Sequence, residues 1–253
     1  MIQRTEEWYL ARKGKITASE CYLLLANHKE AMTEEELAEY KAANPKSRVT
    51  TKEMPFSEAT FTYLKGKVAE RYMEDDKFLY DMDAKQVNSR AIAHGVEHEP
   101  FARALYEQRT GKIVNEVGFI ALKGFEGVAG GSPDGVTHDD KGIIEIKCPW
   151  CSEKHQDYFL FETAEDLKEY NLQYYAQIQF NILVTGAEWG DFVSYDPRMY
   201  ENYDLKVLRV PKDREMCETL LERVKMAKEW MLERMDAISE AQNRQDNEHP
   251  ATP

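Results

Sequence analysis

Cysteine and long apolar runs are both scarce in this sequence of 253 residues. Its four cysteines are too few for a disulfide framework in a chain of this length. No stretch approaches the ~20 apolar residues of a membrane span, and the acidic Glu6 and Glu7 stand where a secretory signal would need an apolar core. We therefore expect a soluble protein of the cytoplasm, with no membrane segment.

Positive charge is also in deficit, with 33 Lys and Arg against 46 Asp and Glu and a net charge of −13. This balance lowers the expectation of nucleic-acid binding, which draws on clustered basic residues. The charges are unevenly spread, however, because Arg4, Arg12, Lys13 and Lys15 make the beginning of the chain basic while residues 30–39 are acid-rich. An acidic total therefore does not exclude DNA as a partner. A phosphate-loop motif is absent, which argues against a nucleotide hydrolase of that type.

Helix signals dominate the first half of the chain. The spacing of apolar residues and caps predicts helices over residues 20–26, 34–44, 57–72 and 89–110. Thr17, Ala18 and Ser19 are placed to cap the first of these, and Gly111 is placed to end the last. Pro100 is expected to kink or restart the last helix. The polar segment 46–55, which lies between two prolines, is expected to be a mobile loop.

From residue 112 the pattern changes to short β-type runs separated by Gly, Pro and Asp. Strands are expected over residues 113–119, 127–130, 142–148, 189–195 and 205–210, with helices over 172–184 and 213–241. Neither an internal repeat nor a long linker occurs. We therefore predict an α/β fold with a mixed twisted sheet flanked by helices, formed by a single domain (1–241) and followed by a flexible polar tail (242–253).

The most informative stretch joins Asp134 to the run Glu145-Ile146-Lys147. Side chains alternate along a strand, so Glu145 and Lys147 point to one side of an otherwise apolar strand. Such charges are costly unless they are paired or bind a metal. Asp134 lies on a turn just before and reaches the same place if the two strands form a hairpin. Two converging carboxylates make an oxygen site suited to Mg²⁺ or Mn²⁺, and a neighbouring lysine can orient a water there.

These residues occur within a longer set of ordered motifs. The set is WYLARKGKITAS (8–19), GVEHE (95–99), GSPDG (131–135), EIKCP (145–149), YYAQIQ (174–179) and YDPRM (195–199). The Asp134…Glu145-Ile146-Lys147 part resembles the signature of the PD-(D/E)XK nuclease superfamily. The whole set, in this order, is similar to the lambda-type phage exonucleases, also called YqaJ-type viral recombinases. The resemblance covers roughly residues 4–230 and is weak between residues 26 and 57.

The resemblance implies a restriction-endonuclease-like core and a processive 5′→3′ exonuclease that acts on double-stranded DNA ends and leaves 3′ single strands. It implies that Asp134, Glu145 and the carbonyl of Ile146 are metal ligands, and that Glu99 helps to hold a second ion. Lys147 would activate or position the attacking water, and Gln177 would line the site. Arg12 and Ser19 would receive the 5′-phosphate, as an arginine fork and a hydroxyl at a helix start can do.

The resemblance also implies cofactors and partners. The cofactor is expected to be Mg²⁺, with Mn²⁺ as a substitute and two ions in the site. Family members form rings of three that encircle the duplex, and they work with a single-strand annealing protein. If the gene belongs to a phage or prophage, the protein would act in the cytoplasm of the bacterial host.

Several alternatives stay open at this point. Glu145 and Lys147 alone could be an ordinary surface ion pair. Cys148 and Cys151 mimic a redox motif but follow a strand directly, and His94 and His98 have helical spacing without the rest of a zinc-protease motif. The same nuclease site could serve an endonuclease of the restriction or junction-resolving type. The chain could also be a catalytically silent scaffold that binds DNA ends.

Overall fold

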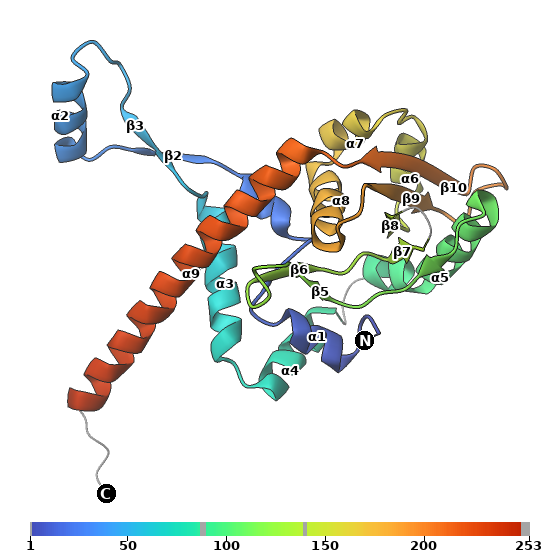
Figure 1. The fold of residues 1–253 in the computed structure, drawn as a ribbon, viewed down its shortest axis with the longest axis horizontal. Helices are drawn as coiled ribbons and strands as arrows, with labels where there is room; N and C mark the ends of the chain where they lie inside the picture. Colours follow the sequence, from blue (N-terminus) through green and yellow to red (C-terminus); the bar gives the residue numbers. More distant parts are fainter. Residues whose placement is uncertain (1, 87–89, 139–140, 249–253) are drawn as a thin grey trace, which may run out of the picture.

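The computed structural model describes residues 2–86, 90–138 and 141–248, and Figure 1 shows their arrangement. The helices are α1 (Glu6–Arg12), the short 3₁₀ helix η1 (Cys21–Leu25), α2 (Glu34–Ala43), α3 (Glu58–Tyr72), α4 (Asp75–Gln86), α5 (Arg90–Thr110), α6 (Ser152–Phe159), α7 (Ala164–Tyr170), α8 (Leu172–Thr185) and α9 (Arg214–Glu248). The strands are β1 (Ile16–Thr17), β2 (His28–Ala31), β3 (Thr51–Met54), β4 (Val114–Asn115), β5 (Ile120–Ala121), β6 (Ala129–Gly131), β7 (Gly135–Thr137), β8 (Gly142–Lys147), β9 (Trp189–Tyr195) and β10 (Leu205–Pro211).

A mixed sheet with the strand order β10-β9-β8-β7-β4 forms the centre of the molecule. Strands β8 and β9 are parallel, from the pair Gly142↔Trp189 to the pair Lys147↔Ser194. The other neighbouring strands are antiparallel. Strand β8 is buried along all but its last residue, as expected for a central strand covered on both faces. This arrangement confirms the predicted mixed α/β fold with a mixed sheet flanked by helices.

Helices α8 and α5 cover opposite faces of this sheet. Ile143 of β8 belongs to a core cluster with Ile178 and Ile182 of α8. The next residue, Ile144, belongs to a different cluster that includes Ala102 and Tyr106 of α5. The alternation along β8 therefore places successive isoleucines under two different helices. The same alternation decides which side of the strand carries Glu145 and Lys147.

A smaller sheet with the order β1-β6-β5 lies next to the large one. Strand β1 pairs with β6 in parallel, and β5 pairs with β6 antiparallel. Helix α8 contacts both sheets, and its Ala176 and Phe180 join a third cluster built mainly from η1, α3 and α9. Helix α8 thus ties the basic first part of the chain to the central sheet.

Residues 28–54, which we call the arm, project from the body of the molecule (Figure 1). The arm consists of β2, α2 and β3, and its strands pair antiparallel from His28↔Met54 to Ala31↔Thr51. At its base, Arg223 of α9 donates hydrogen bonds to the side-chain oxygen of Asn27 and the carbonyl of Pro55. Segment 46–55 was expected to be a mobile loop, but part of it forms β3. No local pattern signals the pairing of β3, because its partner strand β2 ends twenty residues earlier in the chain.

Helix α9 has a buried part and an exposed part. Leu220, Val224, Ala227 and Met231 repeat at intervals of three and four residues and are buried in the core. From Asp236 to residue 247 the helix is exposed, and Figure 1 shows this end pointing away from the body. The helix reaches Glu248, although the sequence predicted its end near residue 241 and a tail from 242. Residues 249–253 of that tail lie outside the described residues, and the single-domain assignment remains a prediction.

The strongest local signals gave correct element ends. Thr33 and Glu36 form a capping box at the start of α2, and Gly111 and Gly186 adopt left-handed backbone conformations at the ends of α5 and α8. Ser19 does not cap the following helix, because that segment is a short 3₁₀ helix preceded by Glu20 without a side-chain cap.

Other differences concern α5 and the short elements. Helix α5 continues through Pro100, so no restart occurs there; the predicted start at Ser89 lies outside the described residues. Only residues 114 and 115 of the predicted strand 113–119 are in β4. Helices α4, α6 and α7 were not predicted. None of the helices in the described ranges has the length and apolar character needed to cross a membrane.

Candidate active site

A cavity of about 410 Å³ opens at the end of the β7–β8 hairpin. Its lining comes from the segment before α1, from α1, α5 and α8, and from the strands that carry the predicted acidic residues. The lining includes Arg4, Arg12, Ser19, Glu99, Asp134, Glu145, Ile146, Lys147 and Gln177. Every residue assigned to the site from the sequence therefore lies around one cavity.

The hairpin that the sequence argument required is present. Gly135 pairs with Ile144, which places Asp134 opposite Glu145 at the open end. The backbone N–H of Asp134 donates to the carbonyl of Ile144 at 3.1 Å. One carboxylate oxygen of Asp134 in turn accepts from the backbone N–H of Ile146 at 2.6 Å. The hairpin therefore fixes both the backbone and the side chain of Asp134.

Glu145 is buried and surrounded by donors. Lys147 Nζ donates to its Oε1 at 2.7 Å, and Gln177 Nε2 donates to the same oxygen at 2.6 Å. Asn181 Nδ2 donates to Oε2 at 3.0 Å. Lys147 also donates to Gln177 Oε1 at 3.2 Å and lies over the ring of Tyr174, with its Nζ 4.6 Å from the ring centroid. One face of α8 therefore holds both charged residues of β8.

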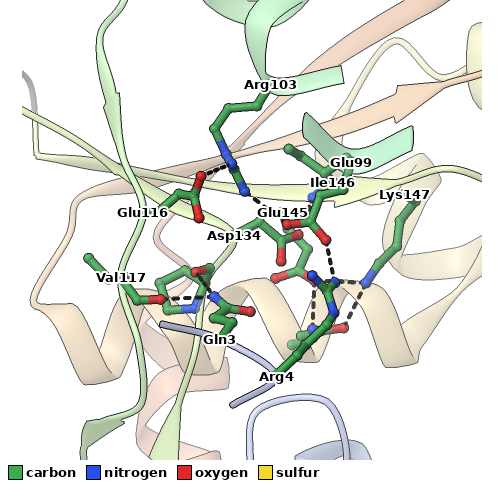
Figure 2. Close-up of polar contacts among 12 residues, drawn as sticks. Gln3, Arg4, Glu99, Arg103, Glu116, Val117, Asp134, Glu145, Ile146 and Lys147 are labelled. Atoms are coloured by element: carbon green, nitrogen blue, oxygen red, sulfur yellow. Dashed lines mark hydrogen bonds and ion pairs between the residues drawn. The ribbon is translucent and has the colours of Figure 1, made fainter. Parts of the chain in front are cut away.

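Glu99 is held by two arginines, as Figure 2 shows. Arg103, one turn further along α5, donates from Nη2 to Glu99 Oε1 at 2.8 Å and also bonds to Glu116. Arg4, which precedes α1, donates from Nη2 to Glu99 Oε2. Both oxygens of the Glu99 carboxylate therefore accept from guanidinium groups.

Burial and mutual repulsion raise the pKa values of Asp134 and Glu145. Burial, and then the charges of Glu145 and Glu99, raise the pKa of Asp134 well above its usual value. Burial also raises the pKa of Glu145, although Lys147 opposes the shift. Burial disfavours the Lys147 ammonium, but Glu145 and Asp134 more than compensate, so its pKa is raised and it carries a proton. The site thus concentrates negative charge that an added cation would stabilise.

The donor set fits a divalent metal ion in its chemistry. Two carboxylates and the carbonyl of Ile146 offer hard oxygen ligands of the kind that Mg²⁺ and Mn²⁺ take. Across the described ranges of the chain, groups of three or more His, Cys, Asp and Glu side chains arranged to hold a metal by themselves do not occur. Arg4 is instead the cation placed against Glu99, and it also feels the charge of Asp134. The Arg4 guanidinium therefore places a positive charge beside the converging acidic groups.

Arg12 and Ser19 lie at the junction of this cavity with a second cavity of about 530 Å³. The Arg12 guanidinium carbon lies 4.0 Å from the centroid of the Trp8 ring. It makes no hydrogen bond or ion pair with any described residue, and burial lowers its pKa. The Ser19 hydroxyl is 3.2 Å from that of Thr17. A half-buried cation that makes no ion pair with a described residue, although the charges of Glu20 and Glu70 act on it, is well suited to bind an anion.

Two of the alternative interpretations lose support from the geometry. Burial and the charges of Glu99 and Asp134 raise the pKa of Cys148 to about 12, whereas a redox-active thiol needs a lowered value. The rings of His94 and His98 contact each other with centroids 4.3 Å apart, and His94 also contacts Trp150. These histidines form an aromatic cluster rather than a set of converging metal ligands.

Several residues of the site were not predicted from the sequence. Asn181 follows Gln177 by one helical turn, and that spacing on an apolar helix was an available signal. Arg103 follows Glu99 by four residues on α5, which is also a recognisable spacing. Arg4 carried no comparable local signal, because its partner lies 95 residues away.

A comparison with protein-family models matches residues 7–188 to the YqaJ-like viral recombinase domain. A search of curated proteins found no match.

Solved structures give a second comparison. An alkaline exonuclease (LHK-Exo) from Laribacter hongkongensis is 27% identical, with a TM-score of 0.68 over 95% of this chain and 99% of that one. The structure of LHK-Exo in complex with dAMP is 26% identical, with a TM-score of 0.69 and the same coverage. A phage-related exonuclease from Haemophilus somnus is 14% identical over 88% of this chain and 96% of that one, with a TM-score of 0.58, and it supports the fold alone.

Proposed function

The chain belongs to the YqaJ-like viral recombinase family, and we propose that it is a metal-dependent 5′→3′ exonuclease acting on double-stranded DNA ends. It would release mononucleotides and leave 3′ single strands for recombination by strand annealing. The observation that carries this proposal is the meeting of Asp134, Glu145 and Lys147 in one cavity that also contains Arg12. The similarity to an alkaline exonuclease over 95% of the chain supports it.

In the proposed reaction, Asp134, Glu145 and the carbonyl of Ile146 would hold a Mg²⁺ ion, and Glu99 would contribute to a second. Mn²⁺ is the expected substitute. When bound, such an ion supplies positive charge to the phosphate under attack and lowers the pKa of a bound water. Gln177 and Asn181 hold Glu145 in place through hydrogen bonds of 2.6 Å and 3.0 Å, so its carboxylate is oriented before any ligand arrives.

Lys147 carries a proton in this environment, because Glu145 and Asp134 raise its pKa. In this protonated form it is a donor that can orient the attacking water and stabilise developing negative charge. Its contacts with Glu145, Gln177 and the Tyr174 ring limit the positions open to the ammonium group.

Arg12 and Ser19 would receive the terminal 5′-phosphate. The Arg12 guanidinium lies over the Trp8 ring and makes no hydrogen bond or ion pair with a described residue, so a phosphate can bind to its donor groups. Arg12 and Ser19 lie at the edge of the cavity that contains Lys147. A 5′-phosphate bound there would determine which phosphodiester of the DNA strand lies at Lys147 to be cut.

The proposal also includes an assembly and a partner. By family resemblance we propose a ring of three subunits around the duplex and cooperation with a single-strand annealing protein. Native mass spectrometry tests the ring, which should have three times the chain mass of 29.4 kDa.

A digestion assay tests the activity. Linear duplex DNA with labelled, phosphorylated 5′ ends should lose mononucleotides with Mg²⁺ and remain intact with EDTA. Asp134→Ala and Lys147→Ala should abolish release, while Lys154→Ala, a change at an exposed residue of α6, should not. Full activity of either site variant would overturn the mechanism. Cleavage of covalently closed circles would favour an endonuclease, and binding of ends without release would favour a silent scaffold.

A further inference from the structure

The segment before α1 is fixed against the candidate site. Gln3 Nε2 donates to the carbonyls of Val117 and Pro133, each at 2.9 Å. Pro133 immediately precedes Asp134, so these bonds anchor the segment beside the metal-ligand hairpin. Figure 2 shows Gln3 and Arg4 entering the site from the side opposite Arg103.

Arg4 has an unusual backbone conformation. Its φ of 65° lies in the left-handed region, which residues other than glycine adopt rarely and at a cost of about 1–2 kcal/mol. Such conformations persist where the surrounding structure determines them, often at functional sites. In this case the Gln3 anchors and the bond from Arg4 to Glu99 are the interactions that hold it.

The two arginines on Glu99 differ in environment. Arg103 is buried on α5 and is tied to Glu116 as well as to Glu99. The Arg4 side chain is 39% exposed and reaches Glu99 from a segment outside the helices. Arg4 can therefore leave Glu99 without disturbing a helix, whereas Arg103 cannot.

We propose that Arg4 is a displaceable cation that occupies Glu99 in the metal-free protein and competes with a divalent metal ion for that carboxylate. This inference rests on the proposed function, because it assigns Glu99 to the second metal ion. A guanidinium and a divalent ion on one carboxylate repel each other strongly at contact distance. Binding of the ion at Glu99 therefore releases Arg4 into the cavity.

Arg4 is thus a positioning residue that acts through Glu99. Once released, its guanidinium faces the cavity shared with Arg12 and Ser19, where a DNA phosphate is the anion expected to bind. DNA then favours the released state, so metal and DNA strengthen each other's binding. In the metal-free protein, Arg4 instead offsets the repulsion between the acidic groups.

Metal affinity of the DNA-free protein tests the inference directly. Mn²⁺ is titrated into the protein, and free Mn²⁺ is followed by electron paramagnetic resonance. Arg4→Ala should bind Mn²⁺ about three- to tenfold more tightly than the unchanged protein, the range of one typical hydrogen bond. Arg4→Lys should stay close to the unchanged protein. Arg244→Ala, which makes the same change in net charge on the exposed end of α9, should have no effect.

A second measurement separates competition from a purely structural role. Arg4→Ala should lower the melting temperature in EDTA, and the difference should vanish with saturating Mn²⁺. Equal destabilisation in both conditions would overturn the inference, as would an unchanged or weaker Mn²⁺ affinity or no binding to either protein. Failure of the proposed nuclease function can be distinguished from failure of this inference. In that case the protein would release no mononucleotides, while its Mn²⁺ affinity would still depend on Arg4.

Discussion

Asn181 is one of the residues of α8 that hold the carboxylate of Glu145 in place. Its amide donates to Glu145 Oε2, while its own Oδ1 is buried without a hydrogen-bond partner among the described residues. Asn181→Ala should lower metal affinity and the rate of mononucleotide release about tenfold or more, the usual effect of losing a group that orients a metal ligand. Calorimetric Mn²⁺ titration measures the affinity. Gln179→Ala is the control, because this buried neighbour on α8 bonds instead to Pro211 and Asp213; an equal loss of affinity there would contradict the assignment.

Arg12 and its neighbour Lys13 make a matched pair for testing phosphate recognition. Arg12→Ala should reduce the preference for 5′-phosphate over 5′-hydroxyl ends about tenfold or more, because charge-assisted hydrogen bonds to the phosphate are lost. Lys13→Ala should leave the preference unchanged, because Lys13 Nζ is bonded to Asp75 and the carbonyl of Met73. The ratio of initial digestion rates on the two substrates measures the effect. An unchanged ratio for Arg12→Ala would remove it from the 5′-phosphate site.

Gly131 is packed so closely that a methyl group there would meet Asn181. A Cβ would lie 2.3 Å from Asn181 Oδ1 and 3.4 Å from the Cβ of Ala18. Gly131→Ala should therefore lower the free energy of unfolding by about 1–3 kcal/mol and also reduce metal affinity. Gly66→Ala, in open space on α3, should instead stabilise the protein by about 0.5–1 kcal/mol. Urea unfolding of both variants measures these opposite changes, and a Gly131→Ala protein with normal stability would show that the contact relaxes easily.

Sequence distance explains which site residues could be predicted. Asp134, Glu145 and Lys147 lie within one hairpin, so strand alternation alone brings them together. Arg4 meets Glu99 across 95 residues of chain, and no local pattern signals that contact. Its position depends on packing of the first residues against the loop before β7, which only the folded structure shows.

At the level of elements, the turn after β9 fixes the segment that follows β8. Arg198 donates to the carbonyls of Pro149 and Trp150 at 3.2 Å and 3.0 Å, and Asp196 accepts from Arg198 Nε at 2.7 Å. The parallel strands β8 and β9 are thus tied together just beyond Lys147. The site depends on this link because it sets where β8 ends.

The pKa of Asp196 makes this link sensitive to acid. Burial alone would raise the pKa of Asp196, but hydrogen bonds from Arg198 and Ser152 lower this pKa to about 2. A carboxylate with a lowered pKa in the folded state stabilises the protein above its ordinary value of 3.8, and this contribution is lost as pH falls towards about 2. Asp196→Asn should therefore reduce the free energy of unfolding by about 2 kcal/mol at neutral pH.

Urea titrations near neutral pH and at about pH 3 test this expectation, because the difference should shrink within the window in which Asp196 gains its proton. Asp236→Asn, on the exposed end of α9, is the control and should change little at either pH. A deficit of constant size at both pH values would mean that the charge of Asp196 is not the cause.

The elements that the sequence predicted well carry strong local signals. The capping box at Thr33 and the glycines at 111 and 186 specify helix ends through a few neighbouring residues. Helices α6 and α7 are short, and their stability comes from packing against the sheet through Tyr158 and Leu167. Helices that are stabilised mainly by such tertiary contacts show little periodicity of apolar residues in the local sequence.

On the scale of the whole molecule, Arg223 of α9 links the body to Asn27 and Pro55 at the base of the arm. The arm's own residues lie outside the core clusters, whereas Phe56, just beyond it, is buried in the core. Replacing residues 29–53 by an Asn-Gly turn between His28 and Met54, which face each other in the ladder, should therefore leave the melting temperature almost unchanged. Differential scanning calorimetry checks this, and a loss of several degrees would show that the arm stabilises the body.

The variant without residues 29–53 also tests what the arm contributes to the proposed assembly of subunits. Its native mass and its rate of mononucleotide release, compared with those of the intact chain, separate a role in subunit association from a role at the site. A full-length control with Arg223→Ala tests the base alone, because Arg223 bonds to both ends of the arm.

The exposed tip between α2 and β3 is a natural attachment point. Val49 at this tip is 44% exposed, and Figure 1 shows the arm projecting away from the sheet that carries the candidate site. A biotin-acceptor peptide inserted there would tether the protein to a coated surface with its cavity free. Individual molecules could then be followed along stretched DNA without a label near the reacting groups.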